Sequence, residues 1–512
     1  MTSTALTPVA EFTDAPGDAV ESSYRKLVRG LWDDGRLTEA ALPTVPELVR
    51  ALGTVGRDRR GHLAVLLGLL AEVEPEQDAR PVHEAVRAGL AGYLDQLAAA
   101  TDDYPFRLAL LYLLAHFPAD AAAIRPVVAG LRLDEDDLTR LERCLQQLDP
   151  DAPDLGRVWP APSAWSLTEA ERALDRKWIS QLTPEQVRIT WRNDTDSLLG
   201  YAGAKARWAV GNGDPVQLPG TVDTVPAGPA APAGAPRHLA VLRCPVCRSG
   251  GLTADTGTDT GTVRCTDCAT RYGMRNGCLD LSAGIDEKTT TVVADVLQES
   301  AVLENIAISY ESRIRPAFLR VMGGNWSGGV TPVDEDRYLD DHVRPVDGPV
   351  LDLAAGSGRW TEVLARRFGA DRVIGLDVNM SMLSCLRRRL PDVLAVRASA
   401  LALPFADASL GAVNCWNALQ ALPDAAEAIA EVGRCLRPGG TFTVMTFRPS
   451  EDPVYAHFQM LHRFPSRPQQ LLLFPPELIE GWLAAAGLTV RHRGGSGTFV
   501  FLTAVRGADR GE

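Results

Sequence analysis

The segment that most restricts the fold is VLDLAAGSGRW at residues 350–360, in which an apolar run leads into small residues and Gly-Ser-Gly. A turn without large side chains lets a ligand lie against the backbone. The residues that follow, RWTEVLARRFG, continue as an amphipathic helix. A second strand-like run, RVIGLD, ends at Asp377, where a carboxylate at the strand tip would accept hydrogen bonds from both hydroxyls of a ribose. The pattern predicts a doubly wound α/β sheet that binds a nucleoside.

Further motifs distinguish this nucleoside from a dinucleotide. Pyrophosphate-binding turns usually carry GxGxxG, whereas Arg359, Trp360 and Thr361 follow the second glycine here. The motifs IGLDVNMSML, ALPFADASLGAV and CLRPGG come next in order, and two β-rich runs joined by glycines predict a hairpin at the sheet edge. In these motifs and their spacing, residues 295–512 resemble the class I S-adenosylmethionine-dependent methyltransferases. The resemblance implies a doubly wound, Rossmann-like methyltransferase domain with S-adenosylmethionine as its cofactor.

The same resemblance implies roles for individual residues. Asp377 would hold the ribose, and Asn379 and Met382 would flank the adenine. Ser399 stands where the family often has an aspartate that binds the adenine amino group, and a hydroxyl could substitute for it. Ala354 replaces a glycine that is often present, and we expect the turn to tolerate it because two later glycines remain. The predicted cofactor-binding set is Asp352, Ala354, Gly356, Gly358, Asp377, Asn379, Met382, Ser399, Ala400, Leu401 and Cys415.

Residues for the chemical step are less sharply indicated. Methyl transfer needs an aligned acceptor and the exclusion of water, and only sometimes a base. Relatives frequently carry a histidine after the fourth strand, where this chain has Gln420, an amide that can orient a substrate but cannot take its proton. Ordinary packing in a helix is an equally good interpretation of Tyr310 and His457. The candidate catalytic residues are Tyr310, Arg313, Gln420, His457 and His462, with Arg315, Tyr455 and Arg463 beside them.

Four of the nine cysteines form two CxxC pairs separated by 17 residues, Cys244 with Cys247 and Cys265 with Cys268. Two such turns supply the four thiolates of a closed tetrahedral zinc site, so we predict a small zinc ribbon over residues 239–285 with a structural metal. The spacing and the tail YGMRNGCLDLS resemble the Trm112-like zinc ribbons that precede bacterial methyltransferase domains. Nucleic-acid binding is the competing role of such a ribbon, although few basic residues surround it.

The first half of the chain has helix-period apolar patterns. Residues 62–90 and 107–131 share leucines and an Arg-Pro-Val sequence at an offset of 45 residues, which favours a HEAT-like repeat over residues 21–211. An ordinary helical bundle with chance similarity is the alternative. Residues 1–20 read as a disordered leader, and the Pro-, Gly- and Ala-rich residues 212–238 as a linker. The sequence thus predicts a multidomain protein with an α-helical domain, a zinc ribbon and an α/β domain.

Charge and composition limit the partners. Residues 1–236 carry 23 Lys and Arg against 34 Asp and Glu, which disfavours nucleic acid. Without a signal peptide or membrane span in the sequence, we expect a cytoplasmic protein whose substrate is a small molecule, free or bound to a carrier protein that the helical domain could dock. Methylation in secondary metabolism is the leading function. Ring closure resembling that of aziridine-forming enzymes of actinobacterial antibiotic pathways, rRNA guanine methylation and a non-catalytic binding role stay open.

Overall fold

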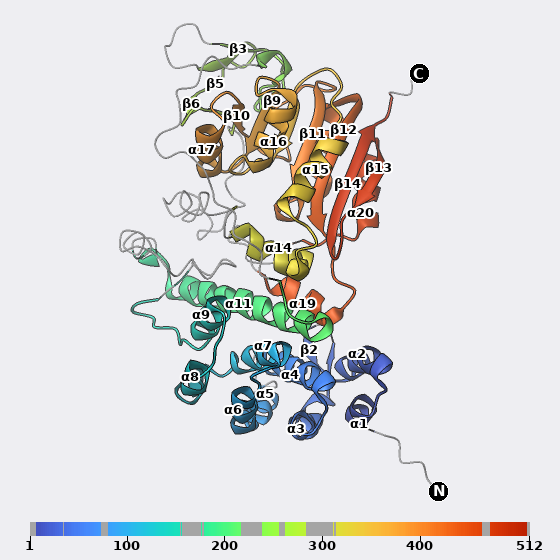
Figure 1. Ribbon diagram of the computed structural model, residues 1–512. Helices are drawn as coiled ribbons and strands as arrows, with labels where there is room; N and C mark the ends of the chain where they lie inside the picture. The colour runs from blue at the N-terminus through green and yellow to red at the C-terminus, as the bar shows by residue number, and fades with distance from the viewer. Residues whose placement is uncertain are drawn as a thin grey trace. The chain divides into compact units, whose positions relative to one another are not determined.

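The computed structural model describes residues 7–33, 35–72, 80–153, 155, 176, 179–216, 238–254, 262–282, 311, 314–462 and 472–508. These residues fall into two compact units (Figure 1). Unit 1 lies within Met1–Leu167, Leu182–Gln217 and Ser450–Arg463, and unit 2 comprises the described residues of the remainder. The chain therefore leaves unit 2 at residue 449 and returns to it at 464, so that a short segment from the C-terminal half belongs to unit 1.

Unit 1 is helical. Its main helices are α1 (Pro8–Thr13), α2 (Val20–Leu31), α3 (Ala41–Leu52), α4 (Arg57–Glu72), α5 (Arg80–Arg87), α6 (Leu90–Ala99), α7 (Tyr104–Leu114), α8 (Ala121–Ala129), α9 (Glu135–Cys144), α11 (Pro184–Asn212) and α19 (Pro453–Leu461), and a short hairpin joins β1 (Trp32–Asp33) to β2 (Arg36–Leu37). The 45-residue offset relates α4 to α7 and α5 to α8. Helix α4 packs against both α5 and α7, but the HEAT assignment stays a prediction.

The predicted disordered leader is wrong for residues 7–20. Pro8–Thr13 forms helix α1, capped by the Thr7 hydroxyl, which accepts a hydrogen bond from Ala10 N–H. Val9 and Phe12 are buried, and Phe12 packs against Tyr24 of α2. The sequence pattern did not reveal this helix because it has only six residues, two of which make the core contacts. Of the predicted linker, residues 217–237 lie outside the described ranges.

Helix α19 packs along α11, and Figure 1 shows the two side by side although α19 begins 269 residues after the start of α11. Two glycines of α11 make the close approach possible. A Cβ at Gly203 would lie 2.4 Å from the ring of Phe458, and one at Gly200 would lie 2.9 Å from Leu461 Cβ. At the start of α19, Asp452 pairs with Arg207 of α11 at 2.6 Å. Helix α19 is thus part of the core of unit 1.

Unit 2 is built on a nine-stranded sheet in the order β13-β14-β12-β11-β8-β9-β10-β7-β6. The strands are β6 (Met274–Arg275), β7 (Cys278–Asp280), β8 (Val350–Leu353), β9 (Val373–Asp377), β10 (Leu394–Arg397), β11 (Leu410–Trp416), β12 (Leu436–Phe447), β13 (Leu488–Gly494) and β14 (Phe499–Arg506). From β7 to β12 all neighbours are parallel, and the C-terminal hairpin β13-β14 is antiparallel at the edge, as predicted. The predicted doubly wound, Rossmann-like sheet is confirmed.

Helices cover both faces of this sheet. They are α14 (Arg315–Gly323), α15 (Pro332–His342), α16 (Arg359–Phe368), α17 (Met380–Arg389), α18 (Ala425–Cys435) and α20 (Pro476–Ala485). Alternate residues of β11 point to opposite faces. On one face, Asn414 of β11 and Thr361 of α16 both donate hydrogen bonds to Asp352 of β8. On the other face, Cys415 belongs to the hydrophobic cluster that contains Ile429 of α18.

The predicted zinc ribbon does not form a core of its own. Its first strands, β3 (Leu252–Ala254), β4 (Val263–Cys265) and β5 (Arg271–Tyr272), make a separate three-stranded sheet, but β6 and β7 extend the large sheet. Leu242, Val263 and Leu279 lie in one hydrophobic cluster with Leu351 and Ile374. The predicted end of the zinc ribbon at residue 285 therefore does not divide one hydrophobic core from another.

Within the described ranges, no single helix combines the length and apolarity that crossing a membrane requires. The helices Tyr104–Leu114 and Pro118–Ala129 are long and apolar enough only when taken together, and a bend of 100° separates them.

Candidate functional site

The glycine turn after β8 has an unusual backbone. Gly356 (φ +54°) and Gly358 (φ +89°) adopt left-handed conformations, and so does Ala354 (φ +56°). A non-glycine residue pays about 1–2 kcal/mol for this conformation, so Ala354 is tolerated at a cost. A Cβ at Gly358 would lie 2.9 Å from Leu386 Cγ of α17, whereas one at Gly356 would meet no described atom within 4 Å. Gly358 thus serves close packing, and the backbone at Gly356 faces open space.

Asp377, at the end of β9, holds the turn in place. Its Oδ2 accepts a hydrogen bond from Gly356 N–H at 2.9 Å, and its Oδ1 accepts one from Asn379 N–H at 2.8 Å. Burial raises the pKa of this carboxyl, and the hydrogen bonds partly oppose that shift. Each carboxylate oxygen keeps a second lone pair for a further donor, so ribose hydroxyls can bind without breaking the turn.

Asp352, also predicted, lies deeper in the sheet. Its side chain accepts hydrogen bonds from Thr361 Oγ1 at 2.6 Å and from Asn414 Nδ2 at 2.8 Å, and only 2% of the residue is exposed. Burial raises its pKa to about 6, against the lowering effect of both hydrogen bonds. Asp352 therefore joins β8, β11 and α16 below the turn.

Three buried polar atoms near this edge test whether a cofactor fits. Ser357 Oγ, Trp360 Nε1 and Asn414 Oδ1 have no hydrogen-bond partner among the described residues. Buried polar groups are normally satisfied, so donors and acceptors left over beside an open glycine turn suit a polar ligand. They fit the charged amino-acid end of S-adenosylmethionine, while Asp377 fits its ribose.

The residues predicted to surround the adenine follow β9 and β10. Asn379 caps α17, since its Oδ1 accepts from Ser381 N–H and Met382 N–H. Ser399 Oγ accepts from Leu401 N–H at 3.1 Å, which forms a local turn and leaves the hydroxyl hydrogen available. Cys415 is fully buried in the core, so only its backbone could line a pocket. Ala400 is half-buried beside these residues, and the adenine-binding roles stay predictions.

Of the five candidate catalytic residues, the structure describes Gln420 in unit 2 and His457 and His462 in unit 1. Tyr310 and Arg313 lie outside the described residues, as does Arg463. Gln420 is buried in unit 2, where its Nε2 donates to Asn417 and its Oε1 accepts from Thr446 Oγ1. The amide is thus occupied in fixing Asn417, which has a left-handed φ of +57°.

Both candidate histidines belong to unit 1. His457 Nε2 lies 2.7 Å from Glu72 Oε1 and packs on Trp32. Burial would raise the pKa of Glu72, but hydrogen bonds and charge interactions with His116 and His457 outweigh it and lower the pKa to about 2. His462 is buried, and burial, with the charge of Arg140, lowers its pKa to about 3. Their catalytic roles stay predictions.

A buried cluster at the end of β11 was mostly missed by the sequence interpretation. Arg315 of α14 pairs with Glu335 of α15 and lies over the ring of Trp360 at 4.4 Å. Glu335 Oε1 also accepts a hydrogen bond from Trp416 Nε1 at 3.2 Å. Arg315 is a candidate by sequence, but Glu335, Trp360 and Trp416 are not. Trp360, two residues after Gly358, and Trp416, the last residue of β11, were the available signal.

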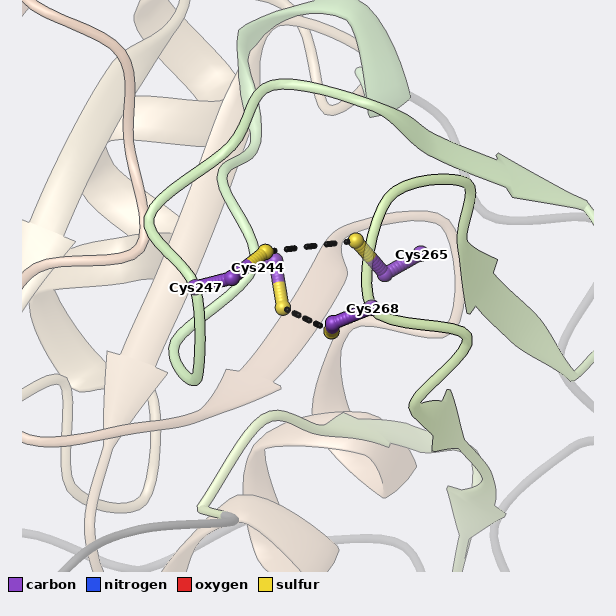
Figure 2. Close-up of side chains that lie close together, drawn as sticks. All are labelled: Cys244, Cys247, Cys265 and Cys268. Carbon is purple, nitrogen blue, oxygen red and sulfur yellow. Dashed lines mark hydrogen bonds between the residues drawn. The ribbon is translucent and has the colours of Figure 1, made fainter.

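The four cysteines converge, as the spacing predicts (Figure 2). Their sulfur atoms all lie within 4.8 Å of one another, and the pairs Cys244–Cys268 and Cys247–Cys265 are each 3.5 Å apart. Cys244 Sγ also lies 2.9 Å from the Tyr272 hydroxyl. Four thiols at these distances are compatible with one tetrahedral zinc ion.

Comparisons with known proteins find methyltransferases that are similar to part of this chain. A family model described as a methyltransferase domain matches residues 350–440. A demethylmenaquinone methyltransferase of Thermus thermophilus is 31% identical over 178 residues, which cover 30% of this chain and 81% of that protein. An uncharacterised chloroplastic methyltransferase of Arabidopsis thaliana is 28% identical over 40% of this chain; the chain spans 61% of its length, and 66% of a second such plant protein. The crystal structure of geranyl diphosphate C-methyltransferase from Streptomyces coelicolor matches with a TM-score of 0.28 and 18% identity over 34% of this chain and 76% of that one.

Proposed function

Because the chain belongs to the S-adenosylmethionine-dependent methyltransferases, we propose that it methylates a small molecule. This proposal rests mainly on one observation at the carboxyl ends of the parallel strands. There the Asp377 carboxylate accepts a hydrogen bond from Gly356 N–H, and no described atom fills the space beside Gly356. Relatives named for quinone substrates, among them the demethylmenaquinone enzyme and a 2-phytyl-1,4-naphthoquinone methyltransferase of Thermosynechococcus vestitus, support a small acceptor.

Different residues would bind the ribose and the amino-acid end of the cofactor. Asp377 would accept hydrogen bonds from the ribose, and the turn at Gly356 with Ser357 Oγ would bind the amino-acid end. When bound, S-adenosylmethionine supplies an electrophilic methyl group on a sulfonium. The protein orients that group toward the acceptor and excludes water. Trp360 and Trp416 are buried at this edge beside the Arg315–Glu335 ion pair, and their indole rings would suit contact with an aromatic acceptor.

The finer assignment, to an acceptor of secondary metabolism presented by a carrier protein, is supported by the acidic helical half of the chain. That half suits contact with a protein better than tracking of nucleic acid. Ring closure on the same scaffold would leave S-adenosylmethionine unconsumed, so the appearance of S-adenosylhomocysteine in proportion to product separates the two reactions.

We also propose that the four cysteines bind zinc as a structural ion. Four thiolates fill a tetrahedral shell, so the ion would have no open position for catalysis. Cys244 and Cys265 are buried, whereas Cys247 and Cys268 are exposed, which gives the ion a path of entry.

Calorimetric titration with S-adenosylmethionine tests the cofactor assignment. We expect micromolar binding by the full chain and at least a hundredfold loss in Asp377→Ala. Asp371→Ala, an exposed aspartate ahead of the same strand, is the matched control and should bind normally. Equal affinity of the two variants would contradict the proposal.

A further inference from the structure

We propose that the four-cysteine site positions the adenine-binding segment, Ser399–Leu401, by holding the chain on both sides of it. This inference rests on the proposed function, because it assumes that S-adenosylmethionine binds at this edge. The segment leaves the sheet after β10 and re-enters the core at Leu403 and Phe405. Its two flanks contact the two halves of the cysteine-bearing region.

The flank after the segment is held by residues next to the first CxxC pair. Arg243 N–H donates to Pro404 O at 2.9 Å, and Ala406 N–H donates to Val241 O at 2.8 Å. Between them, Leu242 and Phe405 form an antiparallel bridge. Cys244, which directly follows Arg243, is a proposed metal ligand. An ion that fixes Cys244 therefore also fixes the strand-like contact with the segment's C-terminal side.

The flank before the segment is held by residues that follow the second CxxC pair. From Cys268 the chain passes through β5 and β6 into β7, which pairs in parallel with β10. Leu281 N–H then donates to Arg397 O at 2.9 Å. Strand β7 is also held by Leu279 in the hydrophobic cluster and by contacts with α17. The second half of the cysteine site adds a direct covalent connection between a proposed metal ligand and the strand that covers β10.

Arg397 carries the contact further, to the ribose carboxylate. Its Nη1 lies 3.5 Å from Asp280 Oδ2 at the end of β7, and its Nε donates to Val378 O at 3.0 Å. Val378 directly follows Asp377. Arg397 is therefore a positioning residue that joins the cysteine-bearing region to both the adenine and the ribose side of the predicted site.

Two sites connected in this way must influence each other equally. Loss of the metal should weaken binding of the nucleoside, and bound nucleoside should raise the affinity for zinc by the same factor. A zinc ion that only stabilised the three-stranded sheet of β3, β4 and β5 would show neither effect.

The test uses the full chain loaded with zinc, and S-adenosylhomocysteine as the probe. We expect removal of zinc by a chelator to raise the Kd from calorimetry at least tenfold, and zinc addition to restore it. Hydrogen exchange should accelerate in residues 394–406 and stay slow in β12. A Kd that changes less than twofold would overturn the inference, and so would faster exchange throughout the sheet, because zinc would then support the fold in general.

A pair of variants tests the connection without touching the cysteines. Arg397→Ala should retain zinc and raise the Kd for S-adenosylhomocysteine several-fold. The control is Arg437, whose guanidinium pairs with Asp347, and Arg437→Ala should leave this Kd unchanged. If the Kd for S-adenosylhomocysteine changes neither on removal of zinc nor in Arg397→Ala, this inference is refuted and the proposed function is not affected. Failure of the zinc-loaded chain to bind the probe at all would refute the proposed function and the inference together.

Discussion

At the scale of single residues, the two carboxylates of the sheet edge differ in what they do. Asp377 accepts two backbone hydrogen bonds and retains free lone pairs toward the open turn, whereas the described contacts of Asp352 are with two side chains in the interior. Asp377 is therefore suited to binding, and Asp352 to holding strands β8 and β11 against α16.

The raised pKa of Asp352 gives a stability prediction. A carboxyl whose pKa is about 6 in the folded chain and 3.8 otherwise contributes stability that is complete below pH 3.8 and is lost as the pH rises through 6. Relative to Asp352→Asn, the wild-type chain should lose about 1 kcal/mol of unfolding free energy between pH 5 and 7.5. Urea unfolding of both proteins at the two pH values measures this difference, and a constant difference would contradict the assignment.

The left-handed backbone of Ala354 gives a second prediction. Glycine avoids the cost of that conformation but adds entropy to the unfolded chain, so Ala354→Gly should stabilise the protein by at most about 1 kcal/mol. Ala355→Gly is the control, because Ala355 has an ordinary backbone and a buried methyl group, and should destabilise. Thermal unfolding compares the two, and the same sign for both would count against strain at Ala354.

At the scale of elements, the fit of α19 against α11 depends on small residues at one face. Gly203→Ala places a Cβ 2.4 Å from the Phe458 ring and should cost about 1–3 kcal/mol of unfolding free energy. Gly211→Ala, in the last turn of the same helix, meets only Arg207 at 3.5 Å and should be neutral or slightly stabilising. Chemical unfolding that shows equal effects for both variants would mean that the two helices do not pack as described.

Elements also show where sequence interpretation succeeds. The glycine turn, Asp377 and the terminal hairpin could be predicted because each is a local pattern of strand, turn and small residue. The partner of Asp352 could not, since Asn414 lies 62 residues away on a strand that reads as continuous core. Strands β6 and β7 have two and three residues, too few for a periodic signal, so their place in the large sheet was missed.

At the scale of the whole molecule, the two units are not continuous in sequence, because residues 450–463 belong to unit 1 although unit 2 precedes and follows them. Tyr455, His457 and His462 are candidate catalytic residues by sequence, and all three belong to unit 1, where α19 packs against α11. No local sequence pattern could predict the packing of α19 in unit 1, because the contacts of Arg207 with Asp452 and of Glu72 with His457 join residues hundreds of positions apart.

This arrangement predicts that the C-terminal half is not soluble by itself. In a chain of residues 238–512, Val454 and Phe458 would lose the helices that bury them, and an exposed apolar helix face promotes association. We expect aggregation in size-exclusion chromatography, and recovery of a monomer when Val454→Ser and Phe458→Ser are added. A monomeric, cooperatively unfolding truncated chain without these changes would contradict the assignment of α19 to unit 1.

The most direct test of the account is a crystal structure of the full chain with S-adenosylhomocysteine. We predict that the ribose hydroxyls donate hydrogen bonds to the Asp377 carboxylate while its hydrogen bond from Gly356 N–H persists. We also predict that the amino-acid end of the ligand lies against Ser357. A nucleoside bound elsewhere, or a turn that must give up its contact with Asp377 to admit it, would contradict the account.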